Sequence, residues 1–259
     1  MIDSAGEQDG APPILSTRAA IRLGVWLGLA AAMIYALGRF TGVDLMLADT
    51  VYDAATGIFP WRDAWVTEMV GHRILKLGLT MCGALIIAFA LGDAIWPQAL
   101  LDRPTARLRL HLIAWSAAGV PLAISLLKQT SNAHCPWDLA RYGGNQPYVR
   151  LFEALPPGAL PGHCLPAGHA SSALWLLSLA VIWLPEQPRK ASRAGCVAIA
   201  FGMVVGWMQQ MRGAHFLTHT LWSVWIACAI VTALALVLQA RVTARRPGRG
   251  VPHGGRRPA

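Results

Sequence analysis

Long apolar runs, separated by shorter polar and basic segments, dominate the chain. Six of these runs reach or approach the length of about 20 residues that a helix needs to cross a bilayer. The six runs cover residues 21–37, 75–95, 110–127, 170–184, 195–209 and 217–238. We therefore predict an all-α polytopic membrane protein whose six transmembrane helices form one bundle over residues 18–240. A polar tail at 1–17 precedes it and a basic, disordered tail at 241–259 follows.

The composition supports a membrane domain over a soluble one. Hydrophobic residues make up 55% of the chain and charged residues 14%, whereas an average soluble domain has about 25% charged residues. This balance excludes a disordered chain, a collagen-like fibre and a small disulfide scaffold, and it disfavours a soluble α/β enzyme. The first apolar run could also be a secretory signal, but five further runs favour an uncleaved helix.

Basic residues indicate the orientation of the bundle. The net charge is +9, with 22 Lys and Arg; if the N-terminus is inside, fourteen of them fall on inner segments and eight on longer outer ones. Inner segments of membrane proteins carry such an excess, so both termini are predicted to be cytoplasmic. We interpret the basic tail as an orientation signal that contacts anionic lipid, with a nucleic-acid tail as the alternative. No nucleic-acid partner is expected, and no sequence feature indicates an oligomeric state.

Five cysteines divide into two groups. Cys82, Cys196 and Cys228 lie inside predicted spans and are expected to be small apolar fillers. Cys135 and Cys164 lie in the second outer loop, at 128–169. Because disulfides persist outside the cytoplasm, we expect these two to pair. Two free thiols, or two metal ligands, are the alternatives.

Ionisable residues gather on the predicted outer side, which makes them functional candidates in a membrane protein. Lys128 ends the third span, His169 opens the fourth and His215 follows the fifth. An antiparallel bundle brings such helix ends together. Cations with several histidines and few acids favour an anionic substrate, of which phosphate is the obvious candidate. Gly168 provides a turn at a helix start, whose backbone donors suit an anion.

These residues resemble the motifs of a known family. Pro166-Ala167-Gly168-His169, with Lys128 upstream and Gly213-Ala214-His215-Phe216 downstream, is similar to the pattern of the type-2 phosphatidic acid phosphatase superfamily. That pattern is Lys, six residues, Arg-Pro; then Pro-Ser-Gly-His; then Ser-Arg, five residues, His, three residues, Asp. The resemblance covers about residues 110–235 and fits six spans.

The resemblance implies roles for matching residues. Lys128 would bind phosphate, His169 would protonate the leaving group, and His215 would be the nucleophile. His219 stands where the family has its Asp and would position His215. An imidazole can orient His215 but lacks the negative charge of a carboxylate, so a different relay, helped by Asp138, or reduced activity is expected.

Further positions depart from the pattern. Cys135 and Gln209 stand where the family has phosphate-binding arginines, and Ala167 replaces its serine. Arg212, one helical turn after Gln209, could supply one missing charge, and Arg141 or Arg150 the other. An alternative register pairs Arg212 with His219 but leaves His215 unexplained.

The resemblance implies hydrolysis of a phosphate monoester or pyrophosphate on a membrane lipid, at the periplasmic face of a bacterial inner membrane. A phosphohistidine would be the intermediate, and no metal or cofactor is expected. One alternative is a phosphotransferase that passes phosphate to a lipid such as lipid A. Another is an inactive lipid-binding or transport protein. His215 and His219, four residues apart, could instead hold zinc or satisfy interfacial hydrogen bonds.

Overall fold

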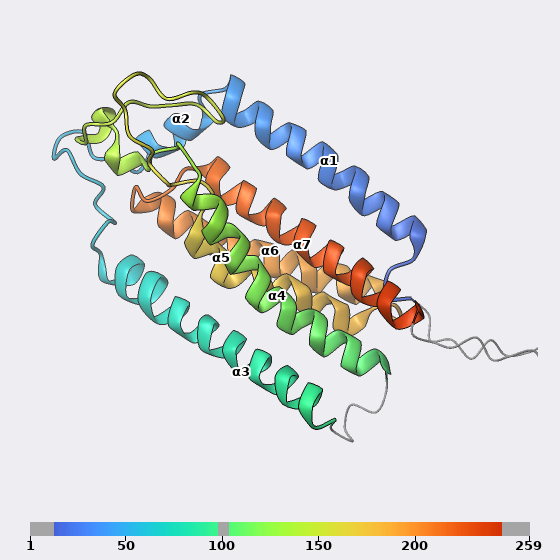
Figure 1. Cartoon of the computed structure of the whole chain (residues 1–259). Helices are drawn as coiled ribbons and strands as arrows, with labels where there is room; N and C mark the ends of the chain where they lie inside the picture. Colours follow the sequence, from blue (N-terminus) through green and yellow to red (C-terminus); the bar gives the residue numbers. More distant parts are fainter. Residues whose placement is uncertain (1–12, 98–103, 245–259) are drawn as a thin grey trace, which may run out of the picture.

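The computed structural model describes residues 13–97 and 104–244, and these residues form an all-α bundle (Figure 1). In chain order, its helices are α1 (Thr17–Phe40), α2 (Val43–Asp49), the π-helix η1 (Val66–Ile74), α3 (Leu75–Ile95), α4 (Pro104–Gln129), the 3-10 helices η3 (Pro136–Asp138) and η4 (Ala140–Tyr142), α5 (Gly168–Leu174), the 3-10 helix η5 (Trp175–Trp183), α6 (Pro188–Met211) and α7 (Leu217–Ala244).

Five helices are long and apolar enough to cross a membrane, which makes the chain a multi-pass membrane protein. They are Thr17–Phe40, Val66–Ile95, Thr105–Gln129, Pro188–Met211 and Leu217–Ala244. The fourth predicted span is a shorter apolar helix, Gly168–Trp183, formed by α5 and η5. Because a 3-10 helix rises about 2.0 Å per residue and an α-helix about 1.5 Å, this segment is about 28 Å long.

The ends of the predicted elements differ from the structure in two places. The second span, predicted to begin at residue 75, starts at Val66 as the π-helix η1, so nine residues of the preceding outer segment are helical. The short helix α2 and turns form the rest of the described segment before it. Of the predicted tails, residues 1–12 and 245–259 lie outside the described residues, and α7 continues to Ala244.

The core of the bundle lies between α4, α5, η5 and α7. Its centre contains Leu112, Val120, Leu174 and Ala227, none of which is exposed. The helices α1 and α3 flank this core (Figure 1), and only 6% and 11% of their most apolar windows are buried. Their exposed apolar side chains are explained by lipid contact, because a bilayer solvates apolar surface.

Both ends of the described chain lie at the same end of the bundle (Figure 1). There Gln239 in α7 accepts a hydrogen bond from the Leu15 amide at 3.0 Å and donates one to the Leu15 carbonyl at 3.1 Å. The loops that join α1 to η1 and α4 to α5 gather at the opposite end. A small apolar cluster around Phe59, Leu139 and Phe216 packs these loops together.

Candidate functional site

Three helix ends bring candidate residues together at the loop end of the bundle. Lys128 lies in the last turn of α4, His169 in the first turn of α5, and His215 in the turn between α6 and α7. The segment before α5 is held on α7, since the Ala167 amide donates to the His219 carbonyl and the Ser223 hydroxyl donates to the Ala167 carbonyl, both at 3.1 Å. The bundle therefore fixes α5 beside α7.

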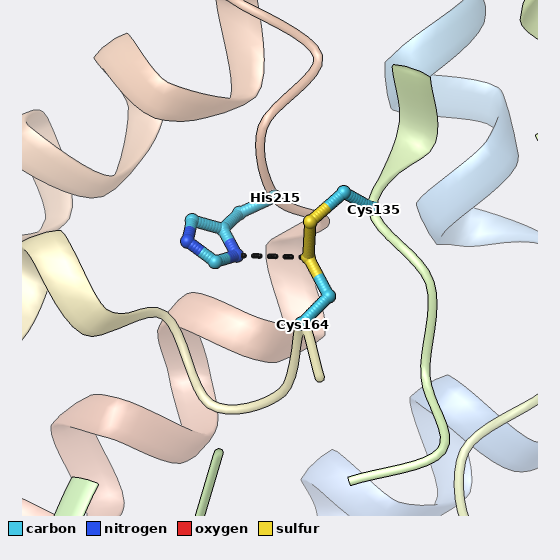
Figure 2. Close-up of side chains that lie close together, drawn as sticks. All are labelled: Cys135, Cys164 and His215. Atoms are coloured by element: carbon cyan, nitrogen blue, oxygen red, sulfur yellow. Dashed lines mark hydrogen bonds between the residues drawn. A yellow bond between two sulfur atoms is a disulfide. The ribbon is translucent and has the colours of Figure 1, made fainter. Parts of the chain in front are cut away.

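A tight turn holds His215 in a buried position. Gly213 has φ +73°, a left-handed conformation that favours glycine, and a Cβ there would come within 2.4 Å of the Phe59 ring. The turn leaves His215 3% exposed. Its Nδ1 faces Cys164 Sγ at 3.4 Å, and Cys164 is joined to Cys135 by a disulfide (Figure 2). Figure 2 shows Nε2 on the far side of the ring, away from the disulfide.

The surroundings of His215 favour its uncharged form. Burial lowers its pKa well below the usual value, and the nearby His219, Lys128 and His169 add to this lowering. The same contributions indicate that His215 lies within electrostatic reach of Lys128 and His169. A neutral imidazole at neutral pH keeps a lone pair on one ring nitrogen, which nucleophilic attack requires.

Asp44 caps the start of α7, where His219 lies. One oxygen of its buried carboxylate accepts from the Thr218 amide at 3.0 Å, and the other accepts from the Thr218 hydroxyl at 2.5 Å. The first amides of a helix have no partner within it, so this side chain satisfies one of them.

Asp44→Ala is therefore expected to lower the free energy of unfolding by about 1–3 kcal/mol, since it leaves two buried donors unsatisfied. Thermal unfolding of the detergent-solubilised protein would measure the change. Asp44→Asn keeps an acceptor oxygen and should lose less stability. Equal stability of the alanine variant and the parent would contradict the capping role.

A cavity of about 450 Å³ lies between α3, α4 and α5. Polar residues, among them Lys76, Lys128 and His169, line one part of it. Apolar and small residues line the rest: Leu79, Gly83, Ala84, Ile87, Ala117, Pro121 and Trp175. Thr80, Ala84 and Ser125 are exposed although they line the cavity, so it opens sideways between α3 and α4. His215 and His219 are buried and are not among the lining residues.

His169 is available to a ligand. Both of its ring nitrogens are buried and have no hydrogen-bond partner within residues 13–97 and 104–244. The His72 ring, from η1, packs against it with the ring centroids 4.0 Å apart and the planes tilted by 43°. Buried polar atoms normally have partners, so the free nitrogens of His169 point to a ligand or water in the cavity.

Arg212, predicted to bind phosphate, is instead bound to other protein groups. Its guanidinium forms a close ion pair with Glu68 of η1, donates to Gln209 Oε1 at 3.0 Å and donates to the Arg62 carbonyl at 2.9 Å. The residue is 7% exposed. The negative charge of Glu68 therefore offsets the positive charge of Arg212 that was expected to bind phosphate.

The other predicted contributors from the loop also have protein partners. Arg141 forms two hydrogen bonds to the Asp49 carboxylate, at 3.0 and 2.7 Å. Arg150 donates to the carbonyls of Arg39 and Thr41, each at 3.2 Å. These contacts fasten the α4–α5 loop to the first part of the chain.

Asp138, suggested as part of a relay, accepts from the Cys135 amide at 3.3 Å. This bond stabilises the turn that begins η3, so the carboxylate has a local structural role.

Glu68 was not considered for the site from the sequence, and His72 and Lys76 were counted only among the ionisable residues of the outer side. The three recur every four residues, which places them on one face of a helix. Their segment was interpreted as an interfacial or re-entrant piece of the outer side, because it contains aromatic and acidic residues. Polar residues at helical spacing directly before an apolar run were the signal that could have identified them.

The donor atoms of Cys135, Cys164 and His215 all lie within 4.8 Å of one another, a spacing that could suit a metal ion. The disulfide occupies both sulfurs, however, and thiolates are the form of cysteine that binds zinc. The His215 and His219 rings meet edge to face, with centroids 5.8 Å apart. The four-residue spacing thus brings these rings into contact with each other.

Lysine and histidine side chains gather at the polar end of a sideways-open cavity in a helical membrane bundle, and this arrangement defines a multi-pass membrane protein with a candidate site for an anion. The chain belongs to the PAP2 superfamily, whose sequence pattern matches residues 109–243, just over half of the chain. The resemblance found in the motifs is thereby confirmed, and membership implies phosphatase-like activity on phosphate esters. Neither a curated protein nor a solved structure matches the chain significantly.

Proposed function

We propose that this protein hydrolyses a phosphate monoester or pyrophosphate of a membrane lipid, through a phosphohistidine on His215. The observation that carries the proposal is the cavity between α3, α4 and α5, which joins a cationic, histidine-containing part to an apolar wall. A lipid phosphate has the same two parts. Membership of the PAP2 superfamily supports the phosphate chemistry.

Binding would place the phosphate at Lys128 and Lys76 and the lipid chain along the apolar wall. Lys76 takes the place that the sequence analysis gave to an arginine, because it lines the cavity with Lys128 while Arg212 is paired with Glu68. Ammonium groups stabilise the charge on phosphate oxygens, on which phosphoryl transfer mainly depends. His215 is buried and is not among the lining residues, so in this proposal the phosphate reaches it beyond the cavity lining.

The reaction would proceed in two steps. In the first, His215 Nε2 forms a bond to phosphorus while the bond to the lipid oxygen breaks, and His169 gives that oxygen a proton. In the second, His169 takes a proton from water, whose oxygen attacks phosphorus as the bond to His215 breaks. His219, whose ring meets His215 edge to face, helps to hold the nucleophile in place.

The active site would face the extracytoplasmic side. The segment Gly168–Trp183, about 28 Å long, approaches the roughly 30 Å thickness of a hydrocarbon core and would be the sixth crossing. An even number of crossings is consistent with both chain ends lying at one end of the bundle. The basic inner segments favour a cytoplasmic location for that end. A bacterial inner membrane remains the predicted location.

A phosphate-release screen with purified protein tests the function. Diacylglycerol phosphates, polyprenyl phosphates and diphosphates, and lipid A would be offered without an acceptor lipid. Release of free phosphate from one of them is expected. Transfer of phosphate to an added acceptor lipid, without release of free phosphate, would establish a phosphotransferase instead, and neither release nor transfer would favour a binding or transport protein.

The apolar wall of the cavity gives a further prediction. Ala84→Phe places a ring in the cavity and should raise KM for long-chain lipid phosphates about tenfold, because the chain loses apolar contact area. A short-chain, water-soluble phosphate should be little affected. Leu85→Phe is the matched control, since Leu85 is 66% exposed on the same helix. Equal KM values for both variants would contradict binding of the chain in this cavity.

A further inference from the structure

The helix that leads into α3 begins in an unusual form. Residues Val66–Ile74 form the π-helix η1, in which each turn is wider than in an α-helix. Such segments are rare and are frequently found at functional sites. Two of its residues, Glu68 and His72, contact the two sides of the candidate site.

Glu68 connects η1 to the turn that contains His215. Its Oε2 forms the close ion pair with Arg212. Arg212 immediately precedes Gly213, where the turn that contains His215 begins. Its Oε1 accepts from Arg73 at 2.9 Å. Arg212 is also bound to Gln209 and to the Arg62 carbonyl. A buried guanidinium held from three directions is a rigid anchor, so Glu68 fixes η1 against the end of α6.

His72 connects the same carboxylate to His169. Its Nδ1 lies 3.5 Å from Glu68 Oε2, the oxygen that also pairs with Arg212, and forms no hydrogen bond within the described ranges. Its ring packs against the His169 ring at a centroid distance of 4.0 Å. His169 has no hydrogen-bond partner within the described ranges, so packing, including this ring contact, confines its orientation.

We propose that Glu68 and His72 are positioning residues for proton transfer by His169. The Glu68 carboxylate attracts the His72 ring electrostatically through the shared oxygen, and the His72 ring holds the His169 ring toward the leaving oxygen. The chain has His219 where its family has an aspartate, and Glu68 supplies a carboxylate to the site from a different helix. The inference rests on the proposed function, in which His169 is the proton donor.

Glu68→Gln tests the inference, because it removes the charge and keeps the size. We expect kcat for an alkyl lipid phosphate to fall about 10- to 100-fold, as misplacing a reacting group costs on that order. KM should change little. With an aryl phosphate, the rate of phosphoenzyme formation should fall much less, since its leaving oxygen needs little protonation. Glu186→Gln is the matched control: it also breaks an ion pair with an arginine, Arg109, at 2.6 Å.

His72→Phe provides a second test that does not disturb the ion pair of Arg212. It keeps an aromatic ring beside His169 but removes the nitrogen that faces Glu68, and it should show the same selective loss on alkyl substrates. Equal losses in the rate of phosphoenzyme formation from alkyl and aryl phosphates, or full activity of both variants, would overturn the positioning role. Failure of the parent protein to release any phosphate would instead overturn the proposed function.

Discussion

His215→Gln is expected to reduce phosphate release from a lipid phosphate on the order of 10³-fold or more, because it removes the nucleophile. The loss should be as large for an aryl phosphate as for an alkyl phosphate, since both need the bond from Nε2 to phosphorus. Glutamine is close to histidine in size, so the buried turn should keep its packing. Phosphate release over time, with both substrates, measures the effect.

The parent protein gives a direct check on the intermediate. Rapid quenching with labelled substrate should trap an acid-labile, base-stable phosphoenzyme in the parent and none in the His215 variant. The thermal unfolding temperature of the variant serves as its control for folding. A variant that folds and still releases phosphate at the parent rate would remove His215 from the reaction.

His169→Gln should affect the two substrate classes differently. Loss of general acid–base catalysis lowers rates by about 10²- to 10⁴-fold, and we expect that range for alkyl phosphates. For an aryl phosphate the first step needs little help from a proton donor, so phosphoenzyme should still form. The second step should be slow, because His169 also activates water. Burst kinetics with p-nitrophenyl phosphate would show rapid release of one equivalent of phenol and slow turnover.

Ser172 offers a matched control for His169, since it lines the same cavity and its hydroxyl donates to the His169 carbonyl at 2.7 Å. Ser172→Ala should keep the burst and most of the turnover. A His169 variant without any burst, or one that forms phosphoenzyme equally slowly from both substrates, would contradict the division of roles between the two histidines.

Most of the membrane architecture could be predicted from the sequence because a bilayer imposes a simple rule. A crossing helix must satisfy its backbone internally and present apolar side chains, so hydropathy reveals it. The run at 170–184 has the same apolar character, but it forms the shorter helix Gly168–Trp183, part of it in the more extended 3-10 form. The start at Val66 was hidden by Glu68, His72 and Arg73, which break the apolar pattern.

The candidate site was only partly predictable, for a different reason. Lys128, His169 and His215 lie at helix ends, and antiparallel packing brings such ends together. The pairing of Arg212 with Glu68 joins residues 144 positions apart, and no local pattern reports such a contact. Arg212 was expected to offer its charge to phosphate, because its pairing with Glu68 depends on the fold and cannot be inferred from the local sequence. Lys76 was likewise counted only as an outer charge.

For the proposed lipid substrate, the sideways opening between α3 and α4 would make concentration a property of the membrane. A lipid that enters from within the bilayer reaches the protein by diffusion in two dimensions, and its chains stay in the hydrocarbon phase. The quantity that sets the encounter rate is then its mole fraction in the surrounding leaflet. The total amount of lipid substrate in the sample would affect the rate only through that mole fraction. The lipid composition around the protein would therefore influence its measured rate.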